Sequence, residues 1–383
     1  MLCVYAQNGE KMNSRDKLYK VIESAKLSGR YCKQTMILAH KNVCIYGLGK
    51  LFEDTFGDRD MAKRFHVNYL SDSNTKKYRG GVFEIPYISP DQLKELDDLI
   101  VIIMVRDATE LEQQFLDWGI PYVAGFELLL EMSLGKVVTA EQFENNKILD
   151  VYDLLEEDAK DTYAELLANR LAPELAEKSY SDLFCPCDYF NGAYFPVTDE
   201  ECFVDCGAYD GDTVRELLKV AKQFRQVYAF EIDNENYDNL GKCVSTLPME
   251  LQKRIKLYHA GVWSENKIIS YGNEKKSGGT SFSILKSSNV QEIHVEKLDD
   301  ILRDEIVTFM KMDIEGSELP ALQGGETIIK VQKPKLAICL YHKIEDFWEI
   351  PMYLHSLVPE YRFGVMHHCG GIFYGTVLYA WCG

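Results

Sequence analysis

Acids and glycines together follow an apolar run in the C-terminal half of the sequence. The run ends at Asp205 and continues as GAYDGDT, so that Gly207 and Gly211 lie in a short turn. Asp212 or Thr213 can cap a helix that starts there. Because glycine carries no side chain, its backbone can approach a bound molecule closely. The pattern predicts a small-molecule site, and a plain tight turn with a helix cap is the alternative.

A second acid has the spacing of a ribose ligand. Glu231 ends the apolar run QVYAFE, about 20 residues after the glycines, which is the offset found in nucleotide-binding folds. A carboxylate can accept two hydrogen bonds from a cis-diol, so this acid indicates a cofactor that contains adenosine. Asp233 is expected to cap the next helix.

A third group of charged side chains lies in MKMDIEGSE, which contains Lys311, Asp313, Glu315 and Glu318. Neighbouring carboxylates raise one another's proton affinity unless a cation lies between them. Strand alternation would direct Lys311 to the same face as Asp313. A divalent ion is the other candidate, since oxygen ligands suit Mg²⁺, but no residue is assigned as a metal ligand. A helix cap with a solvated helix face would explain Glu318 alone.

Alternating strands and helices must bring these groups together. Helical segments separate five apolar runs, ECFVDCGA, QVYAFEID, RIKLYHAGVW, VTFMKMDIEG and KLAICLYH, which predicts a parallel sheet. A short glycine turn joins two further runs, YRFGVMHH and FYGTVLYAW, so these two must pair antiparallel. The prediction is an α/β fold with a seven-stranded sheet. Ligands of open α/β sheets bind outside the carboxyl ends of the strands, where all three groups lie.

Two features favour S-adenosylmethionine over a nicotinamide dinucleotide. Asp205, Asp210 and Asp212 lie close together, and a pyrophosphate needs amide donors without nearby carboxylates. The same acids suit a cofactor that carries an amino group and a sulfonium. The closing antiparallel hairpin is also characteristic of S-adenosylmethionine methyltransferases.

From about Tyr189 to the C-terminus the sequence resembles the FkbM family of S-adenosylmethionine-dependent methyltransferases. The resemblance rests on FVDCGAYDGDT, AFEIDNENYDNL, HAGVWSE and MKMDIEGSELPALQGGE, of which the last is the most specific. It implies a class I methyltransferase Rossmann-like sheet over residues 189–383. It also implies that Glu231 holds the ribose and that Gly261 and Val262 border the adenine. Trp263, a candidate stacking partner, departs from the smaller residue usual in the family.

The cofactor-binding residues that follow from this resemblance are Asp205, Gly207, Ala208, Tyr209, Gly211, Thr213, Glu231, Ile232, Gly261, Val262 and Asp313. Methyl transfer to a hydroxyl also needs a base, and histidine is the commonest choice. His342 is the predicted base, with Asp313, Glu315 and Lys311 at the reaction edge. A structural or solvated His342 is the alternative, and His367 and His368 are expected to be structural.

The N-terminal part of the chain predicts a second, smaller α/β domain over residues 14–135. It opens with a helix over residues 14–28 that ends at Gly29. The pieces IYGLGK and IPYIS resemble the Rossmann-like domain of polysaccharide-biosynthesis proteins, which implies a sugar-nucleotide or glycan context. Asp72 only loosely meets the position of a ribose ligand. A degenerate domain that positions or dimerises the enzyme is the alternative, and residues 136–188 are expected to form a helical connector.

Composition narrows the classes of function. The net charge of −18 argues against a general nucleic-acid or anionic-membrane binder. Eleven cysteines without a framework indicate reduced thiols, and the spacing of Cys185 and Cys187 is not that of a metal knuckle. The N-terminus lacks the apolar core of a secretory signal and the run LIVIIMV is only strand-length, which predicts a cytoplasmic protein without a membrane span.

The sequence therefore predicts an O-methyltransferase that acts on a hydroxyl of a sugar, a glycan or a small metabolite. One alternative is a nucleotide-sugar oxidoreductase that works from GLGKLF in the first domain. Another is a non-catalytic module that binds S-adenosylmethionine. The acceptor and the oligomeric state, including a homodimer, are left open.

Overall fold

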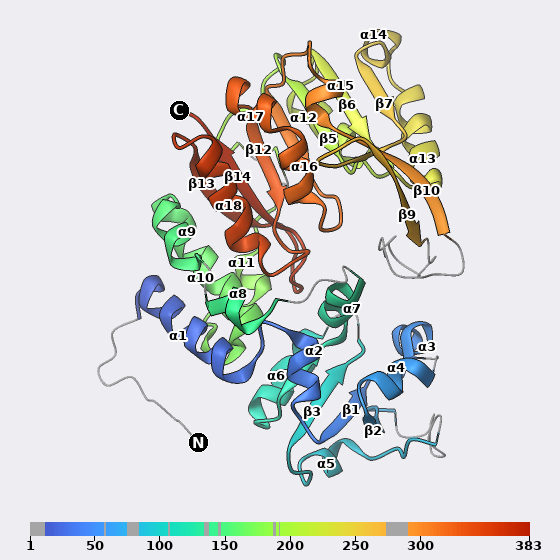
Figure 1. The fold of residues 1–383 in the computed structure, drawn as a ribbon, viewed down its shortest axis with the longest axis vertical. Helices are drawn as coiled ribbons and strands as arrows, with labels where there is room; N and C mark the ends of the chain where they lie inside the picture. The colour runs from blue at the N-terminus through green and yellow to red at the C-terminus, as the bar shows by residue number, and fades with distance from the viewer. Residues whose placement is uncertain are drawn as a thin grey trace.

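Two sheets with their flanking helices lie at opposite ends of the protein, and a group of helices connects them (Figure 1). The structure is a computed structural model of the chain. It describes residues 12–56, 59–74, 84–105, 108–133, 138–144, 147–186, 189–190, 192–272 and 290–383.

The larger sheet has seven strands in the order β13-β14-β12-β11-β5-β6-β7. All neighbours pair parallel except that β14 runs antiparallel to both β12 and β13. The seven-stranded, mostly parallel sheet predicted from the sequence is confirmed. The strands are β5 (Cys202–Cys206), β6 (Gln226–Phe230), β7 (Ile255–Tyr258), β11 (Phe309–Met312), β12 (Lys335–Cys339), β13 (Arg362–His367) and β14 (Thr376–Trp381).

Helices follow the strands of this sheet, and the residues at their N-termini show which of the predicted helix caps form. Asp233 accepts hydrogen bonds from Glu235 N and Asn236 N, as expected of a helix cap. By contrast, the cap of α12 is Gly211 with a φ of 88°, so neither Asp212 nor Thr213 caps it. The helices are α12 (Asp212–Val220), α13 (Asn234–Ser245), α14 (Met249–Gln252), α15 (Leu298–Ile301), α16 (Glu318–Gly324), α17 (Glu326–Gln332) and α18 (Asp346–Leu357).

Helix α18 is absent from the sequence-based expectations because Pro351 lies inside it. Proline removes a backbone donor and disfavours a helix interior. Here Phe347, Ile350 and Leu354 are fully buried on one side of the helix. Burial of this apolar face offsets the cost of the proline.

The third predicted strand, RIKLYHAGVW, is divided between two sheets. Its first part is β7, whereas β8 (Gly261–Val262) pairs parallel with β10 (Val290–Glu296). β10 in turn pairs antiparallel with β9 (Lys267–Gly272), and neither β9 nor β10 was expected from the sequence. This small sheet stands beside the carboxyl end of the large one (Figure 1).

The N-terminal sheet has four parallel strands in the order β2-β1-β3-β4. Of the predicted run VFEIPYI, Tyr87 forms an isolated bridge with Leu70, and residues 82 and 83 lie outside the described residues. The elements are β1 (Asn42–Tyr46), β2 (Val67–Ser71), β3 (Leu99–Ile103), β4 (Tyr122–Ala124), α2 (Lys33–Leu38), α3 (Lys50–Phe56), α4 (Arg59–Arg64), α5 (Pro90–Leu93), α6 (Thr109–Asp117) and α7 (Gly125–Ser133).

Helix α1 (Ser14–Ser28) packs against the connecting helices and not against the N-terminal sheet. Its buried Leu18 and Val21 share a core with Tyr163 of α10, and Lys17 forms a buried ion pair with Glu165. The Gly29 end predicted for this helix is confirmed, with a φ of 70°. The other connecting elements are α8 (Ala140–Glu144), α9 (Ile148–Leu154), α10 (Glu157–Leu171), the 3₁₀ turn η1 (Pro173–Leu175) and α11 (Tyr180–Leu183).

Specific contacts hold the two ends of the molecule together. Lys33 Nζ lies 3.1 Å from a Glu127 carboxylate oxygen and donates to the carbonyl oxygen of Arg170 at 3.2 Å. Thr109 Oγ1 donates to the carbonyl oxygen of Gly371 at 2.6 Å. These contacts tie the N-terminal sheet to the connecting helices and to the loop before β14.

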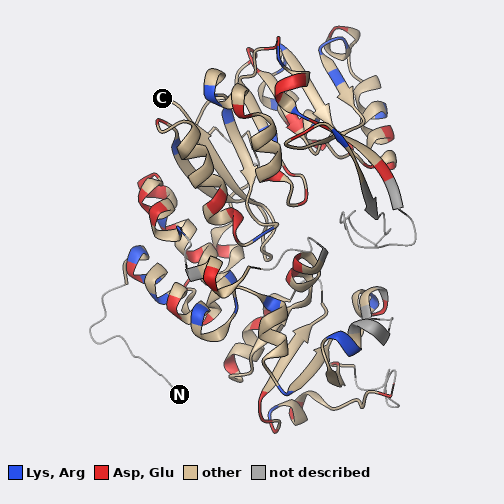
Figure 2. Ribbon diagram, in the orientation of Figure 1, with Lys and Arg blue, Asp and Glu red and all other residues tan. Residues whose placement is uncertain are grey.

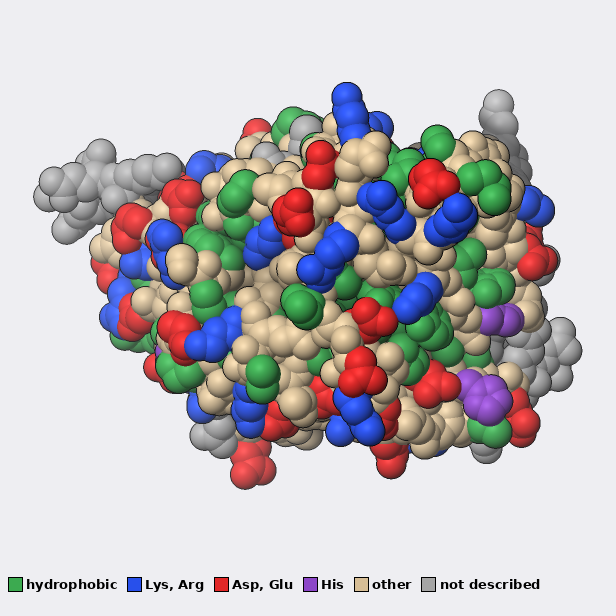
Figure 3. Space-filling view, turned by 90° about the horizontal axis from the view of Figure 1, so that it is seen from above, with side chains coloured by type: hydrophobic (Ala, Val, Ile, Leu, Met, Phe, Trp, Pro, Cys, Tyr) green, Lys and Arg blue, Asp and Glu red, His purple; other side chains and the backbone are tan. Residues whose placement is uncertain are grey.

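Charge is distributed unevenly over these parts. Acidic side chains gather on the connecting helices, for example α9 and α10 (Figure 2). Viewed from the α14 end, the surface instead mixes basic, acidic and apolar side chains (Figure 3). Within the described part of the chain, no helix combines the length and apolar character needed to cross a membrane.

Candidate active site

A cavity of about 820 Å³ lies at the carboxyl ends of β5, β6 and β11, with the small sheet on its other side. Asp205, Ala208, Gly211 and His342 are not among the residues that line it. The residues expected from the sequence that do line the cavity are Gly207, Tyr209, Thr213, Glu231, Ile232, Gly261, Val262, Lys311, Asp313 and Glu315.

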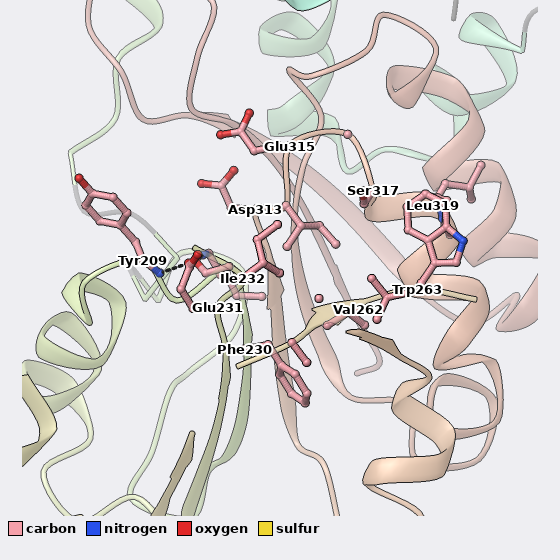
Figure 4. A pocket seen from close by; sticks show the side chains of 18 of the residues that line it. Tyr209, Phe230, Glu231, Ile232, Val262, Trp263, Asp313, Glu315, Ser317 and Leu319 are labelled. Atoms are coloured by element: carbon pink, nitrogen blue, oxygen red, sulfur yellow. Dashed lines mark hydrogen bonds between the residues drawn. The ribbon is translucent and has the colours of Figure 1, made fainter. Parts of the chain in front are cut away.

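The carboxylate of Glu231 is held at the tip of β6 by backbone amides. Tyr209 N donates to Oε2 at 2.9 Å, as the dashed line in Figure 4 shows, and Asp233 N donates to Oε1 at 2.7 Å. The side chain is nearly fully buried, and burial raises the pKa of its carboxyl group to about 7. Glu231 therefore presents a fixed carboxylate to the cavity at the edge of the glycine turn.

The two glycines of the turn are also required by the fold, which adds a second reason for glycine to the predicted approach of a ligand. A Cβ on Gly207, which has a φ of 86°, would meet the carbonyl oxygen of Asp313 at 2.0 Å. A Cβ on Gly211 would meet the Cys243 sulfur at 2.9 Å, where α12 packs against α13. Glycine is required because neighbouring chain segments approach the turn closely, although Gly207 also borders the cavity.

Asp205 and Lys311 form a buried pair beneath the turn. Lys311 Nζ lies 3.2 Å from Asp205 Oδ1 and donates to the carbonyl oxygen of Gly207 at 2.7 Å. Burial raises the pKa of Asp205 to about 6 despite the lysine. Burial by itself would lower the pKa of Lys311, but Asp205 and Asp313 outweigh it and raise the pKa. Asp205 thus anchors Lys311 and does not line the cavity.

Asp313 follows β11 and receives two tyrosine hydroxyls. Tyr341 Oη donates to Oδ1 at 2.7 Å, and Tyr189 Oη donates to Oδ2 at 3.3 Å. Burial would raise the Asp313 pKa, but Lys311 and then His342 outweigh it and lower the pKa. Asp313 is therefore an ionised carboxylate, with 28% of its side chain exposed.

Glu315 lies beside Asp313, and Figure 4 shows the two carboxylates on the same side of the cavity. Its φ of 54° is in the left-handed region, which is costly for a residue with a side chain. Burial raises the pKa of Glu315 to about 7, although a third of its side chain is exposed. The backbone geometry holds this carboxyl group at the reaction edge.

The structure does not favour His342 as the general base. The side chain is fully buried beneath the cavity, with Nδ1 2.9 Å from Glu318 Oε1 and Nε2 facing Asp313 and Glu315. Burial would lower the pKa of His342, but Glu318 and the other carboxylates outweigh it and raise the pKa to about 9. A buried imidazole that carries its proton near neutral pH cannot accept one from a substrate.

Apolar side chains form a large part of the cavity wall. Ile232, Val262, Trp263 and Leu319 surround the space shown in Figure 4. β8 places Val262 and Trp263 there, because the chain leaves the large sheet after Tyr258. Trp263 is thus at the position where a flat, apolar group could stack.

Several lining residues were not assigned to the site from the sequence, although the position of the segment around Tyr189 would let it lie over the site. Tyr189 comes from the irregular segment before β5, and its ring also lies 5.3 Å from Lys311 Nζ. The start of α18 contributes Glu345, Asp346 and Glu349. Asp346 is 1% exposed, and burial raises its pKa well above the usual range. The recurrence of apolar residues at intervals of three and four in the α18 segment is the sequence signal that could have indicated this helix.

Within the described part of the chain, one group of side chains could hold a metal ion. Asp313, Glu318 and His342 offer ligand atoms that all lie within 4.8 Å of one another. The fold and the site together define an α/β protein whose cavity offers a buried carboxylate held by backbone amides, an apolar wall and a group of acidic side chains.

Comparison with known proteins found similarities for the C-terminal half and for the fold as a whole. Residues 205–368 match the family model described as the methyltransferase FkbM domain. The crystal structure of methyltransferase FkbM from Methylobacillus flagellatus KT matches with a TM-score of 0.64 and 23% identity, over 96% of this chain and 100% of that chain. Residues 205–368 are thus similar to the FkbM methyltransferase domain, and the likeness in fold to that structure covers nearly the whole chain.

Two further structures match about half of this chain. A putative rRNA-methylase from Clostridium thermocellum has a TM-score of 0.31 and 12% identity, over 47% of this chain and 86% of that chain. Fibrillarin from Aeropyrum pernix, in complex with natively bound S-adenosyl-L-methionine, has a TM-score of 0.29 and 10% identity, over 48% and 69%. No curated protein matches the sequence.

Proposed function

We propose that this protein transfers a methyl group from S-adenosylmethionine to a hydroxyl group of a sugar, a glycan or a small metabolite. The observation that carries the proposal is the buried carboxylate of Glu231, fixed by Tyr209 N and Asp233 N at the tip of β6. A carboxylate at this edge of an α/β sheet suits the two hydroxyls of a ribose. The matched FkbM methyltransferase domain supports the same chemistry.

The residues of the cavity fit this cofactor. Glu231 would accept hydrogen bonds from the ribose, and Val262 and Trp263 would border the adenine. Asp212 and Thr213, which line the cavity near the turn, would receive the amino end of the methionine part. When bound, S-adenosylmethionine supplies a methyl group on a positively charged sulfur.

The protein contributes alignment and an acidic reaction edge. Holding the acceptor oxygen in line with the methyl group can account for ~7 kcal/mol or more of the barrier. Asp313 and Glu315 would accept hydrogen bonds from the acceptor hydroxyls, while Tyr189 and Tyr341 keep Asp313 in place. Glu315, whose pKa burial raises to about 7, would take the proton that the acceptor oxygen loses as the methyl group leaves the sulfur. His342 lies within 3.6 Å of both carboxylates and does not itself line the cavity.

Titration calorimetry with S-adenosylmethionine tests this proposal. Glu231→Gln keeps the shape of the side chain but removes its charge, and Glu349→Gln makes the same change elsewhere in the cavity wall. We expect weaker binding in the first variant and unchanged binding in the second. A loss of affinity that is equal in both variants, or absent from Glu231→Gln, would contradict the ribose assignment.

Incubation with labelled S-adenosylmethionine and an extract of the producing cell would identify the acceptor. A labelled ether of a sugar or metabolite is the expected product. Binding of the labelled cofactor without transfer to any compound would instead favour a non-catalytic module.

The N-terminal domain is proposed to position the methyltransferase domain or to support a homodimer. Asp72 Oδ2 accepts a hydrogen bond from Leu48 N within the GLGKLF turn, so this amide is already engaged. A carboxylate beside the turn also disfavours a phosphate there. The oxidoreductase alternative predicts binding of NAD, which calorimetry on the same sample would detect.

A further inference from the structure

The imidazole of His342 has two chemically different sides. Nδ1 lies 2.9 Å from Glu318 Oε1, and both side chains are fully buried. Nε2 points the other way, 3.5 Å from Asp313 Oδ1 and 3.6 Å from Glu315 Oε2. Asp313 and Glu315 are partly exposed to the cavity. The ring therefore connects a buried carboxylate with two carboxylates at the reaction edge.

The Nδ1 side is fixed by the fold. Glu318 is the first residue of α16 and accepts a hydrogen bond from Ile314 N at 3.0 Å through the same oxygen that faces His342. The nearby carboxylate favours a proton on Nδ1, so a cation that displaces the other proton of the imidazolium would bind the lone pair of Nε2. Histidines that bind metals usually donate their other nitrogen to a carboxylate or carbonyl in this way.

The Nε2 side lacks a hydrogen bond. Among the described residues, neither ring nitrogen of the completely buried His342 has a hydrogen bond, although Nδ1 lies only 2.9 Å from Glu318 Oε1. Distances of 3.5 and 3.6 Å are too long for hydrogen bonds but suit two ligands of one ion. Two bonds of about 2.1 Å at a tetrahedral angle separate their ligand atoms by about 3.4 Å.

We propose that Asp313, Glu315 and His342 Nε2 bind one divalent cation. Glu318 is a positioning residue and not a ligand, because it approaches Nδ1 and one ion can bind only one nitrogen of the ring. Mixed carboxylate and imidazole ligands favour a first-row ion such as Mn²⁺ or Zn²⁺ over Ca²⁺.

Two features of the reaction edge agree with this site. Glu315 has an unfavourable left-handed backbone, with a φ of 54°, that holds its carboxylate beside Asp313. Asp313 and Glu315 also line the cavity, so further positions on the ion would be open to an acceptor. The binding of an acceptor to the ion is the one part of this proposal that rests on the proposed function. Binding of the ion itself depends only on these side chains.

Binding of Mn²⁺ to the full chain, after treatment with a chelator, tests the proposal. The electron paramagnetic resonance signal of free Mn²⁺ reports the bound fraction directly, and Zn²⁺ competition reports a shared site. We expect one site per chain. Glu315→Gln should weaken binding by at least about tenfold, and Glu318→Gln by about 10- to 100-fold, as for other outer partners of metal ligands.

Matched variants separate a built site from general attraction to acids. Glu349→Gln removes a charge from the same cavity wall and should leave the Mn²⁺ affinity unchanged. Equal weakening in Glu349→Gln and Glu315→Gln, or the absence of any Mn²⁺ or Zn²⁺ binding, would overturn the proposal. The latter result would mean that His342 bridges the carboxylates as an imidazolium without an ion.

Two controls keep the result interpretable. The near-ultraviolet circular dichroism of Glu315→Gln should match that of the unaltered chain, because the side chain is partly exposed. Glu231→Gln should lose S-adenosylmethionine binding and keep Mn²⁺ binding. Failure of the cofactor assignment and failure of the metal site thus give different results.

Discussion

The two parallel sheets present the same arrangement at their carboxyl edges. A glycine with positive φ follows the central strand in each, Gly47 at 91° after β1 and Gly207 at 86° after β5. Gly47 N donates to Ser71 O and Gly207 N donates to Phe230 O, both at 3.0 Å. In the strand orders, β2-β1-β3-β4 corresponds to β6-β5-β11-β12.

An acid follows the adjacent strand in both sheets. Asp72 follows β2 and accepts from Leu48 N at 2.7 Å, as Glu231 follows β6 and accepts from Tyr209 N at 2.9 Å. Backbone geometry alone therefore does not distinguish the two edges.

The difference lies at the next strand. β3 is followed by Met104, which is buried and apolar, whereas β11 is followed by the ionised Asp313. After Asp313 the C-terminal edge continues with Glu315 and Glu318, and all three carboxylates face His342. The comparison shows that the same edge can serve as structure or as a reaction site, depending on the side chains at its strand ends.

Replacement of the two turn glycines, Gly47 and Gly207, by alanine should give the largest difference in stability between the two sheets. In Gly207→Ala the new Cβ would meet the backbone oxygen of Asp313 at 2.0 Å, and we expect a loss of about 3–5 kcal/mol. In Gly47→Ala the nearest atom is a Val105 side-chain carbon at 2.6 Å, which can move. Thermal unfolding should show the smaller loss for Gly47→Ala, and equal losses would remove this distinction.

Replacement of the buried Lys311 should have the next largest effect on the free energy of unfolding. Lys311→Met leaves Asp205 buried without a counter-charge, which typically costs about 3–5 kcal/mol. The double variant with Asp205→Asn should recover part of this loss. Urea unfolding measures both, and a double variant no more stable than Lys311→Met would contradict the pairing.

The two corresponding acids should differ in their effect on cofactor binding. Glu231→Gln removes a charged hydrogen-bond acceptor and should cost about 1.5–3 kcal/mol of S-adenosylmethionine affinity. Asp72→Asn makes the corresponding change in the N-terminal sheet and should leave that affinity unchanged. Calorimetry on both variants measures the contrast. A loss of S-adenosylmethionine affinity in Asp72→Asn would indicate that the cofactor binds at the edge of the N-terminal sheet instead.

The raised pKa of Glu231 predicts a dependence on pH. Because the pKa is about 7 in the folded protein and lower in the unfolded chain, ionisation of Glu231 costs stability as pH rises toward 7. A ribose prefers the ionised form, so affinity for S-adenosylmethionine should fall below pH 7, by up to about tenfold per pH unit. Calorimetry at several pH values should show a flatter profile for Glu231→Gln than for the unaltered chain.

Removal of a contact between the N-terminal domain and the loop before β14 should have the smallest effect on stability. Thr109→Val removes the hydroxyl that donates to Gly371 O, which should cost about 1 kcal/mol. Cofactor affinity should not change, since neither residue lines the cavity. A large loss of affinity in this variant would indicate that the N-terminal sheet helps to organise the site.

The amino-acid sequence alone determined the local elements and the order in which they carry polar groups. The periodicity of apolar residues predicted the strands of the large sheet, and short signals predicted the cap at Asp233 and the end of α1 at Gly29. The spacing from the glycine turn to Glu231 placed both at one edge, because parallel strands direct their carboxyl ends to the same side.

Only the tertiary structure decided what each polar group faces. The burial of His342 against Glu318, the approach of Asp313 O to Gly207, and the arrival of Tyr189 over the reaction edge join residues far apart in the chain. No local pattern encodes such contacts, since they depend on how closely neighbouring strands and helices pack. For the same reason the sequence predicted a base at His342, whereas packing makes it a buried partner of three carboxylates.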